Sequence, residues 1–225
     1  MFEQGRALVD GAVDRGALAM LIGRYCILRL SITGSAHELL SHAAEATQIA
    51  EELDDPVLRG YIWFMADTLD EKRGHAQSSF MWAARVEREV GSDSRLGMEL
   101  VGLSLHAASY WARGTALACL GRLAESEAAF DECARSAAEV GDLDVLAWAA
   151  NGRSFLATAS GGAPTFLSAA RQAVDTAVAT DNGAARSFAL SAVGAGCLLN
   201  DQTEDARDAL RASVESANEL RTGRF

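Results

Sequence analysis

Basic residues and proline are both scarce in this chain of 225 residues. Lys and Arg number 20 against 31 Asp and Glu, which gives a formal net charge of -11. A protein that holds a phosphate backbone needs a basic face, so this balance argues against direct contact with nucleic acid. The only prolines are Pro56 and Pro164, whereas alanine is frequent. Because alanine has the lowest helix cost and proline breaks helix interiors, the composition favours helices.

Cysteine pairs and a secretory signal are also lacking. The four cysteines form no C-x-x-C motif, and even the closest two, Cys119 and Cys133, are well separated. Their scatter predicts buried small apolar residues in a reducing compartment. The amino-terminal segment is acidic, and the most apolar window, residues 16–32, contains Arg24 and Arg29. That window is predicted to be too short and too charged to span a bilayer, so we expect a soluble cytoplasmic chain.

Motifs that carry catalysis or hold a cofactor are missing as well. The sequence contains no Walker-type phosphate loop, no H-E-x-x-H and no G-x-S-x-G, and no strand is expected before the glycines at 194–196. His37 and His42 fall on different helix faces, and the histidines are expected at the surface or as helix caps. The pair Asp54-Asp55 is interpreted as a cap. We therefore predict no metal, no cofactor and no enzyme.

Helical periodicity is what the sequence does contain. Between residues 36 and 53, small or apolar residues recur at steps of three and four, which places them on one helix face. Residues 76–90 and 126–140 repeat this pattern, and no long stretch alternates with period two. The stretches 53-LDDP-56 and 140-VGDLD-144 combine residues that close one helix with residues that cap the next.

The helical segments recur at regular intervals, which indicates a repeat protein. Gly121, Gly161 and Asp201 follow one another at a constant interval of about 40 residues, where a turn between two helices is expected. The last apolar position before each break recurs at a similar interval, at Val13, Leu53, Val90, Val140, Thr180 and Leu220. Each unit is therefore predicted to be a helical hairpin that buries its apolar face against its neighbours. The predicted ranges, within one domain over 1–225, are a half repeat at 1–15 and hairpins at 16–55, 56–93, 94–142, 143–182 and 183–225.

The longest step in this series, from Val90 to Val140, falls in the unit 94–142. Residues 94–120 are predicted to form either an unusually long first helix or a helix with a break. In the second half of this unit, Ser126, Phe130 and Cys133 belong to the buried stripe, so the acidic residues around them are interpreted as a solvated face.

The run 110-YWARGTALACLGRLAESEAAFDECA-134 resembles a tetratricopeptide repeat (TPR). The residues that carry the resemblance are Tyr110, Gly114, Leu117, Gly121, Ser126, Phe130 and Cys133. Their counterparts in the last unit are Leu190, Gly194, Cys197, Asp201, Ala206, Leu210 and Ser213. The units are longer than the usual repeat of this family and lack its proline at the end of the second helix. Alanine-rich repeats of this length resemble the helical arrays of large bacterial signalling ATPases and LuxR-type transcriptional activators.

This resemblance implies an all-α, right-handed superhelix whose first helices line a concave groove. The repeat phase places seven residues toward that groove: Arg24, Tyr61, Met65, Trp111, Trp148, Asn151 and Phe155. Arg113 and Arg153, separated by one repeat interval, would occupy equivalent sites and clamp a carboxylate of a ligand. The favoured alternative is that each arginine pairs with a nearby acidic residue of the chain itself, and that the aromatic residues belong to the core between repeats.

The function implied is a non-enzymatic interaction or regulatory module. It would bind a protein segment or a small effector in its groove, as part of a larger bacterial transcriptional or signalling regulator. One alternative is a stand-alone helical enzyme with an unrecognised site. The other is a scaffold that self-associates through exposed apolar ends, at residues 2–13 or beyond Leu220. Neither end is a polar capping helix, which predicts a piece of a longer protein or ends that pack on a partner, including a homo-oligomer.

Overall fold

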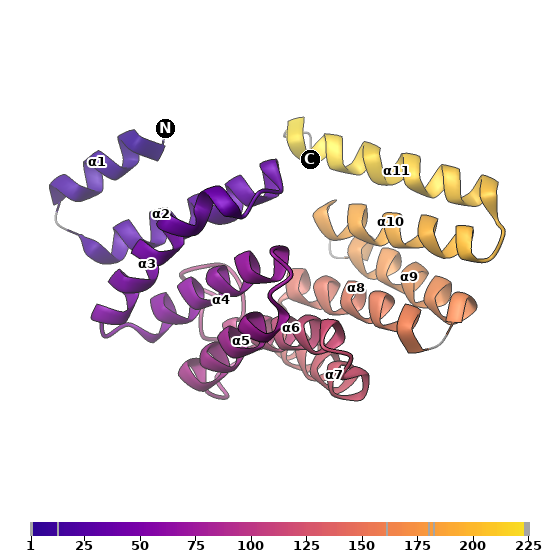
Figure 1. The fold of residues 1–225 in the computed structure, drawn as a ribbon, viewed down its shortest axis with the longest axis horizontal. Helices are drawn as coiled ribbons and strands as arrows, with labels where there is room; N and C mark the ends of the chain where they lie inside the picture. The colour runs from indigo at the N-terminus through magenta and orange to yellow at the C-terminus, as the bar shows by residue number, and fades with distance from the viewer. Residues whose placement is uncertain (1, 13, 161, 180, 182, 223–225) are drawn as a thin grey trace. The chain divides into compact units, whose positions relative to one another are not determined.

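The computed structural model describes residues 2–12, 14–160, 162–179, 181 and 183–222, which contain α-helices, one 3-10 helix and no strand (Figure 1). The chain packs as two compact units, residues 1–120 and 121–225. The helices of the first unit are α1 (Phe2–Ala12), α2 (Arg15–Thr33), η1 (His37–Leu39), α3 (Leu40–Glu52), α4 (Pro56–Lys72), α5 (Ala76–Val90) and α6 (Leu105–Cys119). Those of the second unit are α7 (Leu123–Val140), α8 (Leu143–Ser160), α9 (Gly162–Ala179), α10 (Gly183–Leu199) and α11 (Thr203–Thr222).

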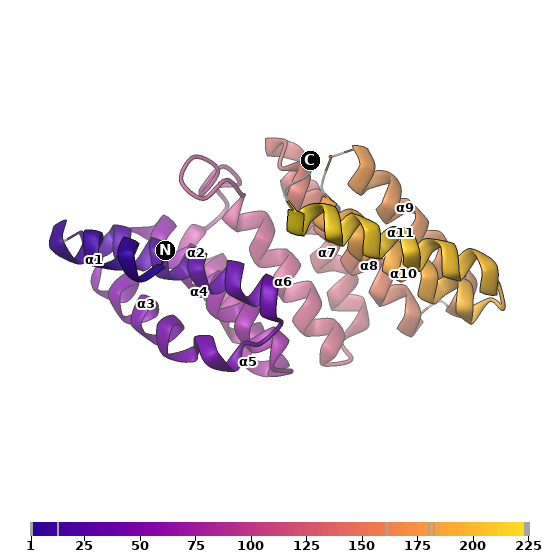
Figure 2. The same ribbon diagram turned by 90° about the horizontal axis from the view of Figure 1, so that it is seen from above.

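Within each unit, successive helices lie side by side (Figures 1 and 2). In the first unit α2 packs on α3, α4 on α5, and α5 on α6; in the second unit α7 packs on α8, α8 on α9, α9 on α10, and α10 on α11. Of the predicted hairpins, residues 143–182 contain α8 and α9, and residues 183–225 contain α10 and α11. Consecutive packing of this kind is the arrangement of a helical solenoid, and it confirms the all-α prediction.

Capping residues fix where the helices begin. The Asp55 carboxylate accepts hydrogen bonds from the backbone N–H groups of Val57 and Leu58, both at 3.0 Å, and Pro56 occupies the first turn of α4. This confirms the prediction that Asp55 is a helix cap. Asp14, Ser104 and Asp142 cap α2, α6 and α8 in the same way.

The turns inside the hairpins agree with the predicted repeat spacing where the structure describes them. Gly121 and Asp201 both adopt a positive φ, of 73° and 59°. Their predicted counterpart Gly161 lies outside the described residues, as do Val13, Thr180 and the side chain of Leu220. The stripe on α7 is buried, because Phe130 and Cys133 are at most 1% exposed, whereas the neighbouring Asp131 is exposed.

The prediction for residues 94–120 was wrong, because the segment before α6 is a loop. Residues 91–104 form a series of turns, and the helix starts only at Leu105. Gly97 has φ +100°, and a Cβ on it would lie 2.6 Å from the carbonyl oxygen of Leu103. His106 is buried, and its Nδ1 lies 2.6 Å from the Gly91 oxygen, which corrects the expectation of a surface or capping histidine. The close packing at Gly97 and the contact between His106 and the Gly91 oxygen hold residues 91–104 as a loop instead of a longer helix.

Two further expectations need correction. By length and composition alone, α2 is long enough and apolar enough to cross a membrane. This corrects the prediction that residues 16–32 are too short and too charged to do so. In the structure, α2 packs on α1, α3 and α4. Three cysteines are buried as predicted, but Cys119 is exposed because it lies at the end of α6.

Candidate functional site

The two arginines predicted to clamp a ligand both pair within the chain. Arg113 of α6 donates a hydrogen bond from Nη1 to Oε2 of Glu87 on α5, at 2.8 Å. Arg153 of α8 forms a hydrogen-bonded ion pair with Asp131 of α7. The internal-pairing alternative is therefore confirmed, and the carboxylate clamp is not supported by the geometry.

Tyr61 and Met65 belong to the core of the first unit and not to a binding surface. Their exposed fractions are 6% and 0%, because α4 contacts α2, α3, α5 and α6. Gly23 of α2 allows this approach, since a Cβ there would lie 3.0 Å from Cε1 of Tyr61. Burial raises the pKa of Tyr61, and the charge of Arg24 opposes that shift. The burial of Tyr61 agrees with the core alternative for the aromatic residues, whereas the groove prediction for Met65 was wrong. The repeat phase predicts a helix face but not how many neighbouring helices cover it.

Arg24 and Trp111 lie near this core. Arg24 is exposed, and its Nη2 donates a hydrogen bond to the Leu100 oxygen of the loop before α6, at 3.2 Å. Trp111 is half-buried, and its ring centre lies 6.3 Å from that of Phe64 on α4. Trp111 therefore packs within the first unit, as the core alternative for the aromatic residues predicted.

The second unit differs, because it exposes aromatic rings on its first helices. Trp148 of α8 is half-buried, and Phe155 is 55% exposed. Asn151, between them, is buried and donates from Nδ2 to the Ala185 oxygen at 3.1 Å, which joins α8 to α10. Phe188 of α10 is 62% exposed and was missed by the sequence analysis. The repeat offset from Trp148 to Phe188 is the signal that would have found it.

The bond between Asn151 and Ala185 sets the register of the two helices. Because α9 runs back between them, α8 and α10 point in the same direction. Phe155 lies four residues beyond Asn151, and Phe188 lies three residues beyond Ala185, so both phenyl rings are about one helical turn further along. The exposed rings therefore lie at the same level of neighbouring helices.

The exposed side of α10 carries no charge. Its exposed positions are Phe188, Ser191, Ala195, Leu198 and Leu199, spaced as one helix face. We use the name α8–α10 face for the surface formed by Trp148, Phe155, Phe188, Ser191, Ala195 and Leu199. An exposed apolar surface of this kind is suited to contacts with another apolar group.

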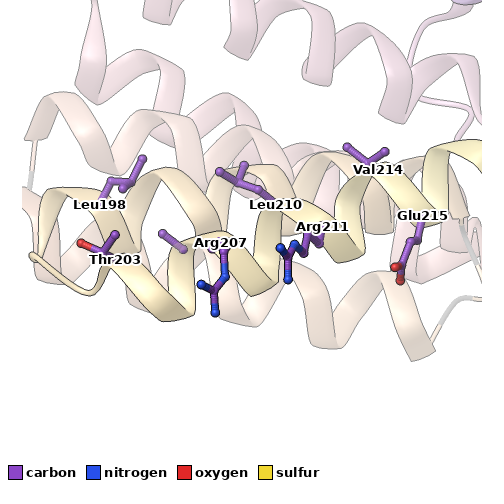
Figure 3. Close-up of a pocket in the computed structure, with 8 residues that line it drawn as sticks. Leu198, Thr203, Arg207, Leu210, Arg211, Val214 and Glu215 are labelled. Atoms are coloured by element: carbon purple, nitrogen blue, oxygen red, sulfur yellow. The ribbon is translucent and has the colours of Figure 1, made fainter.

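A second apolar surface follows α11 (Figure 3). It is a shallow depression with a volume of about 760 Å³. In Figure 3, the apolar side chains of Leu198, Leu210 and Val214 follow one side, whereas the charged groups of Arg211 and Glu215 extend to the other. We use the name α11 face for the surface formed by Leu198, Thr203, Arg207, Leu210, Arg211, Val214 and Glu215.

A buried carboxyl group in the first unit stands apart from both surfaces. Asp67 of α4 is 1% exposed and accepts a hydrogen bond from Ser79 Oγ of α5 at 2.6 Å. Burial raises its pKa from 3.8 to about 8. Among the described residues, no three or more His, Cys, Asp or Glu side chains are arranged to hold a metal ion. The hydrogen bond between Asp67 and Ser79 joins α4 to α5.

Comparisons with solved structures agree with the helix arrangement. BtubC (BKLC) from P. vanneervenii aligns over 98% of this chain and 88% of its own, with a TM-score of 0.65 and 15% identity. A signal transduction ATPase (STAND) protein with a tetratricopeptide repeat sensor, from Pyrococcus horikoshii, aligns over 99% of this chain with a TM-score of 0.61 and 12% identity. This chain spans about a third of that protein, 34% of its length. A putative kinesin light chain of Podosopora anserina with TPR-like repeats aligns over 98% of both chains, with a TM-score of 0.55 and 13% identity.

The fold is TPR-like. No protein-family model matches the chain, and no curated protein matches it by sequence. At identities of 12–15%, the likeness shows the fold alone. The TPR-like resemblance seen at residues 110–134 is thereby confirmed as a property of the helical repeats.

Proposed function

We propose that this chain is a non-enzymatic interaction module that binds an apolar protein segment on the α8–α10 face. The observation that carries the proposal is the pair Phe155 and Phe188, more than half exposed at the same level of adjacent helices. Contiguous exposed apolar surface marks a site of association in a folded protein. The uncharged exposed side of α10 extends this surface without the desolvation cost of a buried ion.

An amphipathic helix suits this surface. Its apolar residues at spacings of three, four and seven would contact the two phenyl rings and the α10 stripe in turn. Full burial of one exposed phenylalanine side chain contributes roughly 1.5–3 kcal/mol. Two such anchors are enough to dominate the binding energy, because a few buried aromatic residues carry most of the affinity at an interface.

A place in a larger bacterial signalling or transcriptional regulator is the setting that we propose for this module. The likeness to a signal transduction ATPase with a tetratricopeptide repeat sensor supports the signalling part of this setting. Occupancy of the α8–α10 face would regulate such a protein only if the segment bound one of two states more tightly. The groove-bound small effector considered from the sequence has no comparable polar site among the residues of the α8–α10 face.

A peptide display library tests the proposed function directly. The wild-type chain is used for selection, and the variant Phe155→Asp/Phe188→Asp for counter-selection. Selected peptides are then measured by isothermal titration calorimetry against wild type, the double variant and Met81→Asp. Met81 is 61% exposed in the first unit and serves as the matched control.

The expected result is binding to wild type and to Met81→Asp, with loss of at least tenfold in affinity for the double variant, consistent with the burial of two phenyl rings. Circular dichroism must show the same helix content in all three proteins. Peptides that bind the double variant as tightly as wild type would place the site elsewhere, and a library without enriched peptides would contradict the proposed function.

A further inference from the structure

The α11 face includes an exposed apolar strip. The equivalent side of the preceding hairpin, on α9, is covered by the next helix, α10. Val214 is 60% exposed, and Leu210 is 38% exposed. The equivalent positions one repeat earlier are Val174 and Ala170 of α9, and α10 packs on that helix, so that Ala170 is fully buried beside Ala192. The α11 face therefore has the shape and chemistry of a helix-packing surface, but with larger apolar side chains.

Two charged residues border this apolar strip in a definite order. Arg211 and Glu215 are one helical turn apart, on the edge of α11 opposite the apolar side chains (Figure 3). Neither residue forms an ion pair with another described residue, whereas Arg207 pairs with Glu204. The edge of α11 that borders the strip thus presents a basic group followed by an acidic group, and both groups are available to a partner.

We propose that the α11 face is the interface of a homodimer in which the α11 helices of two copies pack antiparallel about a two-fold axis. Such an axis brings the same edge of both helices together and reverses their direction. With the axis near residue 213, Arg211 of each copy faces Glu215 of the other. In this register Leu210 and Val214 of each copy both lie within about one helical turn of the axis, so the apolar side chains of the two copies meet near the centre.

The order of the charges is what selects a second copy as the occupant. An antiparallel pair forms two Arg211–Glu215 contacts, one from each copy, so the surface is complementary to itself. A parallel pair would place Arg211 level with Arg211, and like charges at an interface are strongly unfavourable. Isologous two-fold dimers are the commonest symmetric assembly of soluble proteins. This interface is independent of the α8–α10 face and does not require the proposed function.

Sedimentation velocity over a series of protein concentrations tests the proposal on the full chain. Wild type is expected to dimerise reversibly. Val214→Glu should be monomeric, because it places charge in the apolar centre. Val178→Glu, at a position of α9 that is 58% exposed, is the matched control and should dimerise as wild type does.

A charge exchange tests the antiparallel register. Arg211→Glu and Glu215→Arg should each weaken dimerisation by roughly tenfold or more, because each creates two like-charge contacts. The double variant Arg211→Glu/Glu215→Arg should return the dissociation constant to within about threefold of wild type, since it restores two opposite-charge contacts. Circular dichroism and thermal melts exclude loss of folding as the cause.

Three results would overturn the homodimer. They are a monomeric wild type at the highest soluble concentration, a dimer that persists in Val214→Glu, and a double charge variant no better than the single ones. The variant Phe155→Asp/Phe188→Asp should still dimerise. If Phe155→Asp/Phe188→Asp loses peptide binding but still dimerises, or if Val214→Glu loses dimerisation but still binds the peptide, the two faces act independently. The two proposals can therefore fail separately.

Discussion

The phenyl ring of Phe130 on α7 lies against Gly152 on α8, where a Cβ would be 2.3 Å from Cε1 of the ring. Phe130 is 1% exposed, so its ring has no solvent side into which it can move. The absence of a side chain at residue 152 is therefore what allows α7 and α8 to pack at this distance. Gly194 and Leu210 pack in a similar way inside the last hairpin, where a Cβ on Gly194 would lie 2.6 Å from Cγ of Leu210.

The first prediction concerns this contact. Gly152→Ala should lower the free energy of unfolding by about 1–3 kcal/mol, as overpacking of a filled core does. Phe130→Ala should lower it by about 3–5 kcal/mol, because it leaves a cavity. Urea titration followed by circular dichroism measures both changes. Gly16→Ala is the control, since a Cβ there would meet no atom closer than 3.5 Å. A neutral Gly152→Ala would show that the ring does not pack as described.

The second prediction is that two adjacent carboxylates, Asp54 and Asp55, contribute differently to the free energy of unfolding. Asp55→Ala should lower the free energy of unfolding by about 1 kcal/mol, because it removes the cap from two backbone N–H groups of α4. Asp54→Ala should change it by less than about 0.5 kcal/mol. The Asp54 side chain is fully exposed and lies 3.8 Å from Arg59, so its ion pair is weak. Equal effects of the two substitutions in a urea titration would contradict the capping role of Asp55.

The helical hairpins were predictable because their signals are local. The apolar stripe through Phe130 and Cys133, the cap at Asp55 and the turn glycine Gly121 all act within a few residues of the chain. Local spacing therefore predicted where the helices begin and end in most of the sequence. The loop at 91–104 was not predictable in this way, because it is held by contacts such as that between His106 and the Gly91 oxygen.

The candidate site was harder to predict because exposure depends on neighbours distant in sequence. Met65 occupies a position that the repeat phase assigned to the groove, yet helices on several sides bury it. Phe155 occupies a comparable position on α8 and is 55% exposed. Phe188 was not predicted, although the repeat offset from Trp148 leads to it. The repeat phase thus predicts which side chains share a face, and packing decides which of them reach solvent.

The third prediction concerns thiol reactivity. A disulfide reagent should modify Cys119 rapidly in the folded protein, because this thiol is exposed at the end of α6. Cys26, Cys133 and Cys197 are buried and should react only on unfolding. Burial also raises the pKa of Cys26 to about 11, which lowers its thiolate fraction further. Absorbance of the released leaving group measures the rates, and Cys119→Ser should remove the rapid phase. A rapid phase that survives this substitution would show that another thiol is accessible.

The fourth prediction concerns Asp67, whose pKa rises from 3.8 to about 8 on folding because burial disfavours its charge. Between these pH values the unfolded chain has lost the proton and the folded chain keeps it. The folded state therefore binds more protons, and the stability that Asp67 contributes at acid pH is lost as pH rises through about 8. Asp67→Asn stays neutral and keeps an acceptor for Ser79. Its free energy of unfolding relative to wild type should increase steadily from pH 5 to pH 8, by at most about 1.4 kcal/mol per pH unit, in urea titrations. Parallel stability curves for the two proteins would show that Asp67 is ionised in the folded state.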